Sequence, residues 1–81
     1  MKKILYFSAP WCGPCKTLGP IIDALSSTIN VEKINVDVDQ TQSTKYGVRN
    51  IPTLVLVENG VEKNRLIGLK SQEDILNFYH G

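Results

Sequence analysis

Hydrophobic positions divide the first part of the chain into two segments of different period. Residues 3–7 form an apolar run, typical of a strand buried on both faces. From Lys16 the spacing becomes helical, and one face carries Leu18, Ile21, Ile22, Leu25 and Ile29. Pro20 lies inside this predicted helix and removes a backbone donor there. We therefore expect a kink between Lys16 and Pro20.

The middle of the chain returns to an alternating pattern and then becomes polar. Residues 32–37 alternate as a strand does, which predicts that Ile34, Val36 and Val38 face inward. Residues 40–46 form a short polar segment that ends at a glycine. We expect a short helix here, closed by Gly47 as its C-terminal cap.

The last part of the chain predicts a hairpin followed by a helix. Residues 53–57 are apolar, and Asn59-Gly60 is a strong signal for a tight turn, so residues 61–67 should return antiparallel. That returning strand alternates poorly and carries several charges, which suits an exposed sheet edge. Ser71-x-x-Asp74 is a capping sequence for a final helix, whose apolar residues are Ile75, Leu76, Phe78 and Tyr79.

The resulting order, β-α-β-α-β-β-α, predicts an α/β fold with a four-stranded mixed sheet and three helices. The first two strands should be parallel, because a helix joins them, and helices should cover both faces. A length of 81 residues leaves room for one domain, residues 1–81. We find no repeat, linker or low-complexity segment in the chain.

Composition and charge exclude several kinds of partner. Hydrophobic residues make up 42% and charged residues 21%, as in ordinary globular proteins. The net charge is +1, and no run of Lys or Arg exceeds two residues, so we expect neither a nucleic-acid nor a membrane partner. The apolar run near the N-terminus is too short for a signal peptide. These observations favour a cytoplasmic monomer.

The chain has two cysteines, Cys12 and Cys15, and their spacing points to chemistry. So close a pair closes almost no loop and stabilises the fold little. Two thiols on the first turn of a helix can bond to each other reversibly. Cys12, near the helix N-terminus, should be the activated thiolate nucleophile. Cys15, one turn further in, suits the resolving role. Gly13 and Pro14 keep the connecting turn small and stiff.

A metal site is the main alternative use of the two cysteines. Structural zinc needs four ligands, and the only further candidate is His80 next to the C-terminus. A site within one chain therefore fails on ligand count, whereas a site shared between two chains stays open. We expect no metal and no cofactor.

The segment Trp-Cys-Gly-Pro-Cys-Lys at positions 11–16 resembles the active-site signature of thioredoxins. Pro20, residues 33–37, residues 45–53 and Gly68 follow the family pattern in register. The resemblance implies a protein-disulfide reductase of cell redox homeostasis. Its partners would be disulfide-containing proteins and an electron donor of the thioredoxin reductase type. It also implies a cis Ile51–Pro52 peptide facing the cysteines, and substrate contacts at Trp11, Gly13, Pro14, Ile51, Pro52 and Gly68.

The chain departs from the family pattern in two ways. It opens directly at the central strand, so it resembles the short core shared with glutaredoxins, as in small phage and archaeal redoxins. Where family members commonly carry a buried Asp beneath the second cysteine, this chain has Tyr6. In the family that Asp, with a lysine matching Lys33, is thought to help the second cysteine lose its proton.

Tyr6 is neutral near pH 7 and cannot act as a carboxylate base. We therefore expect water or the leaving thiolate to deprotonate Cys15, with the Tyr6 hydroxyl orienting it. Lys33 is open to two interpretations, a solvated lysine or a catalytic one.

Two other functions compete with the reductase. A glutathione-coupled, glutaredoxin-like enzyme fits the short fold, but the aromatic residue usual between glutaredoxin cysteines and the double glycine near Gly68 are missing. A binding subunit of a viral polymerase would use the fold without its redox cycle. Trp11 could also be an ordinary surface aromatic, although its place beside Cys12 favours substrate contact.

Overall fold

The computed structural model describes residues 1–81, and its four strands form one mixed sheet in the order β2-β1-β3-β4. The strands are β1 (Lys2–Ser8), β2 (Val31–Asn35), β3 (Thr53–Glu58) and β4 (Val61–Ile67). The helices are α1 (Gly13–Leu25), α2 (Gln40–Lys45) and α3 (Gln72–His80). The predicted order of elements is confirmed, as is the mixed four-stranded sheet.

Strand β1 lies inside the sheet, with a neighbour on each side. It runs parallel to β2, where Ile4 is opposite Val31, and antiparallel to β3, where Phe7 is opposite Thr53. Its residues 4–7 are all buried. The unbroken apolar run is therefore explained, because alternate side chains enter two different cores.

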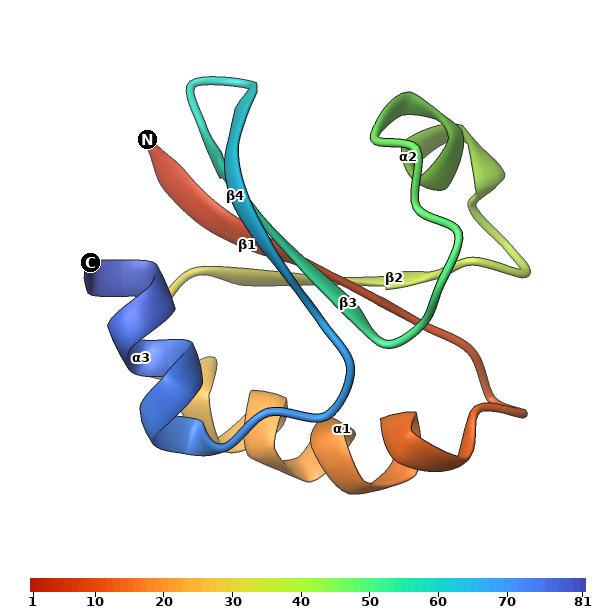
Figure 1. Cartoon of the computed structure of the whole chain (residues 1–81), viewed down its shortest axis with the longest axis horizontal. Coiled ribbons are helices and arrows are strands. Elements are labelled where there is room, and N and C mark those ends of the chain that lie inside the picture. Colours follow the sequence, from red (N-terminus) through yellow and green to blue (C-terminus); the bar gives the residue numbers. More distant parts are fainter.

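Helices cover both faces of the sheet, as predicted. Figure 1 shows α1 and α3 together on one face and α2 on the other. The core beneath α1 and α3 consists of Ile4, Tyr6, Leu18, Ile22, Leu25, Ile29, Leu54, Leu56 and Ile75. The core beneath α2 is smaller and consists of Leu5, Phe7, Ile34, Val55 and Val57. None of the three helices is both long enough and apolar enough to cross a membrane.

The hairpin between β3 and β4 confirms the turn predicted from Asn-Gly. Asn59 and Gly60 have φ values of 55° and 82°, and positive φ at both central residues suits the right-handed twist of the two strands. The pairing register shifts between Leu56 and Val57, so Lys63 has no partner opposite it. This bulge, together with the edge position of β4, accounts for its irregular alternation.

The prediction for the second strand was wrong at its end. Strand β2 stops at Asn35, because the side chain of Asn35 accepts a hydrogen bond from the Asp37 amide at 2.9 Å. Its backbone carbonyl accepts two more, from Val38 at 3.0 Å and Asp39 at 2.8 Å. The chain turns outward here, and Val38 is 82% exposed instead of facing inward. Val36 remains partly buried against the core beneath α2, as expected.

The helix boundaries agree with the sequence except at the end of the first helix. Helix α1 contains Pro20 but ends at Leu25, so Ile29 is buried in the turn beyond the helix and is not part of its face. Gly47 follows α2 with a φ of 62°. The Ser71 hydroxyl accepts a hydrogen bond from the Asp74 amide at 3.1 Å and caps α3, as predicted.

Candidate active site

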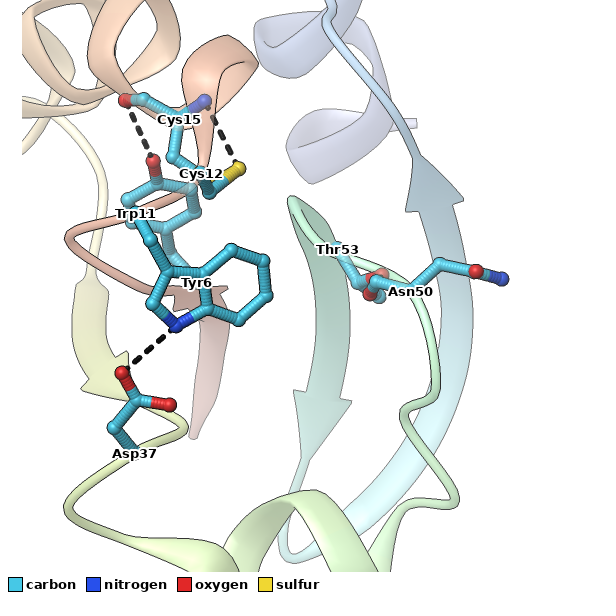
Figure 2. Close-up of a disulfide and its surroundings, with 7 residues drawn as sticks. All are labelled: Tyr6, Trp11, Cys12, Cys15, Asp37, Asn50 and Thr53. Atoms are coloured by element: carbon cyan, nitrogen blue, oxygen red, sulfur yellow. Dashed lines mark hydrogen bonds between the residues drawn. A yellow bond between two sulfur atoms is a disulfide. The ribbon is translucent and has the colours of Figure 1, made fainter.

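Cys12 and Cys15 form a disulfide at the start of α1, with their Cα atoms 5.3 Å apart. Cys12 is the N-cap residue, and its Sγ accepts a hydrogen bond from the Cys15 amide at 3.2 Å, drawn in Figure 2. The two residues are only 4% and 6% exposed. The first sulfur therefore lies at the unpaired N–H groups of the helix, where negative charge is stabilised.

The residues between the two cysteines leave open surface beside the disulfide. Pro14 lies in the first turn of α1, where its missing N–H is not needed. Gly13 and Pro14 are both exposed, and a Cβ built on Gly13 would meet no atom within 4 Å beyond its chain neighbours and the nearby helix backbone. The Cys12 amide donates to the Ala9 carbonyl at 3.1 Å and closes the turn that follows β1.

Trp11 is 67% exposed, yet its indole is held in place. Its Nε1–H donates to Oδ2 of Asp37 at 2.9 Å, and Figure 2 shows the ring lying between this carboxylate and the cysteines. Asp37 is itself fixed by the turn that ends β2. The sequence did not reveal Asp37 as a site residue, because its contact with Trp11 depends on where that turn places it.

The segment leading into β3 lies at the same end of the sheet as the cysteines. Thr53 pairs with Phe7 near the end of β1, and Figure 2 shows Asn50 and Thr53 across from the disulfide. The Ile51–Pro52 peptide is cis, as expected. Pro52 is buried, and its carbonyl accepts a hydrogen bond from the Gly68 amide at 2.9 Å. Gly68 has a φ of 94°, a conformation that favours glycine.

Ile51 offers its backbone, and not its side chain, to this site. The side chain is half-buried and packs against the core beneath α2. Its backbone N–H and C=O belong to no helix or strand and make no backbone hydrogen bond. These groups therefore have no backbone partner within the chain.

Tyr6 lies beneath the second cysteine and is 2% exposed. Its hydroxyl donates to the backbone carbonyl of Cys15 at 3.2 Å, as Figure 2 shows. Burial raises the pKa of the phenol above its ordinary value, a contact with Ser8 opposes the rise, and the negative charge of Asp23 adds to it. The hydroxyl therefore stays protonated and orients the backbone of Cys15.

A cavity of about 280 Å³ opens beside Cys15, and Tyr6 and Lys33 are among its lining residues. The ammonium of Lys33 forms an ion pair with the carboxylate of Asp23 on α1. The Lys33 side chain is half-exposed and also lines the cavity, so both interpretations from the sequence stay open. Asp23 is a second residue that sequence reasoning missed.

No group of three or more His, Cys, Asp or Glu side chains could hold a metal ion. His80, the one further ligand candidate in the sequence, lies at the end of α3, with its ring edge-on to Tyr79 at a centroid distance of 5.1 Å.

Comparison with known proteins agrees with this geometry. The sequence profile of the thioredoxin family matches residues 1–80. A thioredoxin from Rickettsia typhi is 43% identical over 79 residues, which cover 93% of this chain and 75% of that protein.

Two solved structures share the fold. A single-residue mutant of a thioredoxin from Halobacterium salinarum superposes with a TM-score of 0.90 at 34% identity, covering 98% of this chain and 72% of the other. The thioredoxin of Fasciola hepatica gives a TM-score of 0.89 at 28% identity, covering 98% and 78%. With its disulfide at the start of α1, the chain therefore belongs to the thioredoxin family of thiol–disulfide oxidoreductases, enzymes that reduce protein disulfides.

Proposed function

We propose that Cys12 is the attacking thiolate and Cys15 the resolving thiol of this reductase. The observation that carries the proposal is the N-cap position of Cys12, whose Sγ already accepts the Cys15 amide. A thiolate at this atom gains that hydrogen bond and the positive end of α1, so its pKa should fall. Cys15 lies one turn inside the helix and has no such advantage.

The reaction transfers two electrons through two thiol–disulfide exchanges. The Cys12 thiolate attacks one sulfur of the substrate disulfide, a Cys12–substrate bond forms, and the other substrate sulfur leaves as a thiolate that takes up a proton. Cys15, once deprotonated, then attacks Sγ of Cys12. The Cys12–Cys15 disulfide forms, and the second substrate thiolate leaves and is protonated. A reductase restores the dithiol.

Groups on both sides of the disulfide support binding of an extended substrate segment. The free backbone N–H and C=O of Ile51 would pair with it as an added strand does. The exposed surface of Trp11, Gly13 and Pro14 would contact its side chains, and Gly68 would hold the Pro52 carbonyl in place from behind.

The same proposal includes a setting for the enzyme. Residues 1–81 would form one domain that acts as a monomer in the cytoplasm, with electrons from a reductase of the thioredoxin reductase type. The net charge of +1 offers no attraction for nucleic acid or for an anionic membrane. Sedimentation of the purified chain tests the monomer, and a stable dimer would overturn it.

Insulin reduction tests the reaction and its electron donor together. We expect insulin disulfides to be reduced with NADPH and thioredoxin reductase, and to be reduced poorly with glutathione and glutathione reductase. Activity with glutathione alone would favour the glutaredoxin-like alternative. Cys12→Ser should abolish turnover, whereas Cys15→Ser should accumulate the mixed disulfide on Cys12, visible as an added mass. Trapping on Cys15 instead would reverse the two roles.

The polymerase-subunit alternative predicts a different result. A double variant, Cys12→Ser with Cys15→Ser, would then still support the biological function in a complementation assay. We expect it to fail, because the reductase needs both sulfurs.

A further inference from the structure

The cavity beside Cys15 connects the resolving thiol to solvent and contains no carboxylate. The titratable groups that line it are Tyr6 from β1, Lys16 from α1 and Lys33 from β2, together with Cys15 itself. Cys12 does not line it. Cys15 is only 6% exposed, so this cavity is the solvent-filled space next to it. A charge at the mouth of the cavity therefore acts on Cys15 more strongly than on Cys12.

The position of the Lys33 ammonium is decided by a residue outside the cavity. Lys33 is paired with Asp23, which lies on α1 eight residues after Cys15, or about 12 Å further along the helix axis. Asp23 therefore draws the ammonium along α1 and away from the thiol. The two side chains are 51% and 61% exposed, and ion pairs this exposed are weak, so this one opens readily.

The charge of Asp23 also reaches the cavity directly. It contributes to the raised pKa of the Tyr6 phenol, whose hydroxyl touches the backbone of Cys15. Asp23 therefore disfavours a thiolate at Cys15 in two ways: its negative charge acts on the side of Tyr6, and it holds the Lys33 ammonium away from Cys15.

We infer that Asp23 is a positioning residue that restrains the resolving step by holding the Lys33 ammonium away from Cys15. The inference rests on the proposed role of Cys15 as the resolving thiol. When the ion pair opens, Lys33 turns into the cavity and its charge stabilises the Cys15 thiolate. The rate of resolution then depends on a contact between two surface side chains, Asp23 and Lys33.

Removing the carboxylate tests the inference. Asp23→Asn frees Lys33, and the pKa of Cys15 should fall by about 0.3–0.5 unit, a ~2- to 3-fold rise in thiolate below that pKa. Reaction of the reduced protein with the aryl disulfide DTNB separates the two steps. The first release of thionitrobenzoate reports attack by Cys12, and the second reports resolution by Cys15. The second should accelerate by that factor, with its pH profile shifted to lower pH, whereas the first should not change.

The chain offers a matched control in a second exposed ion pair. Lys3 and Glu32 are 2.8 Å apart, are 38% and 44% exposed, and do not line the cavity. Glu32→Gln removes the same charge as Asp23→Asn and should leave the second release unchanged. Asp23→Glu keeps a carboxylate within reach of Lys33 and should restore the original profile. In a Lys33→Gln background, Asp23→Asn should lose most of its effect.

Two results would overturn the inference. One is an Asp23→Asn profile that matches that of Glu32→Gln. The other is a slower second release in Asp23→Asn, which would mean that the pair assists Cys15 instead of restraining it. Failure of the proposed function looks different, because the mixed disulfide with a substrate would then be trapped on Cys15 in Cys12→Ser and not on Cys12 in Cys15→Ser.

Discussion

The hydroxyl of Tyr6 is the one polar group that the buried core directs at the backbone of the resolving cysteine. Tyr6→Phe removes this hydroxyl and keeps the ring, so the packing of the core beneath α1 and α3 is preserved. The main interaction it removes is the hydrogen bond from the phenol to the Cys15 carbonyl at 3.2 Å; a contact with Ser8 is lost as well. We expect the fold to loosen locally at the first turn of α1.

The size of the effect follows from the geometry of this bond. A buried hydrogen bond contributes about 0.5–1.5 kcal/mol net. At 3.2 Å the Tyr6 bond is longer than is usual for O–H···O, so the lower half of that range, about 0.5–1 kcal/mol, applies. For a domain of this size, that loss corresponds to a melting temperature ~2–8 °C lower.

Thermal unfolding of the oxidised protein, followed by circular dichroism at pH 7, measures this loss. Tyr79→Phe is the matched control, because the Tyr79 hydroxyl donates to the Lys2 carbonyl at 3.3 Å, far from the cysteines. Both variants should lose similar stability, but only Tyr6→Phe should slow resolution by Cys15. An unchanged melting temperature in Tyr6→Phe, or equal slowing in both variants, would refute the reasoning.

Three further changes test other parts of the structure. Tyr6→Asp places a carboxylate beneath Cys15 and should alter the pH profile of insulin reduction. The smaller side chain also leaves a cavity, which should lower the free energy of unfolding by ~3–5 kcal/mol. An unchanged pH profile would exclude a role for this position. The hydrogen bond from Arg65 lowers the pKa of Glu62 below its ordinary value of 4.5. The ionised carboxylate therefore stabilises the fold above the ordinary pKa, and this stabilisation is lost as the pH falls through the lower pKa of the folded state. Glu62→Gln should lower the free energy of unfolding, measured with urea, by ~0.5–1 kcal/mol at pH 7 and should not change it in strong acid. A stability difference that persists in strong acid would contradict an ionic origin. Gly68→Ala should lower the free energy of unfolding by about 1–2 kcal/mol, because alanine is strained at the φ of 94° that Gly68 adopts. A variant as stable as the original chain would show that the loop adapts.

Local signals predicted most of the fold because they coincide with the final contacts. The Asn59-Gly60 turn, the Ser71 cap and the apolar run of β1 all act over a few neighbouring residues, so the sequence reveals them directly. The end of β2 was missed because Asn35 redirects the chain with its own side chain and carbonyl, which hydropathy does not register. Val38 looked like the next inward position of a strand that had already ended.

The site was predictable where its chemistry lies within a short motif. Cys12 and Cys15 are three positions apart, and a helix start fixes their geometry whatever surrounds it. The partners of Trp11 and Lys33 were not predictable in the same way. Asp37 reaches Trp11 from the turn after β2, and Asp23 reaches Lys33 from the far half of α1. Several other acidic residues in the sequence were equally plausible partners before the chain was folded.

The central place of β1 has a consequence for how the chain is made. A ribosome completes β1 first, but one of its two neighbours in the sheet, β3, is synthesised much later, and Lys2 pairs with Glu58. Until β3 emerges, β1 lacks one of its two neighbouring strands, and its apolar side chains lack the β3 residues of both cores. We therefore expect nascent chains that end before β3 to stay unfolded and to depend on chaperones, with folding starting only when the hairpin has left the exit tunnel.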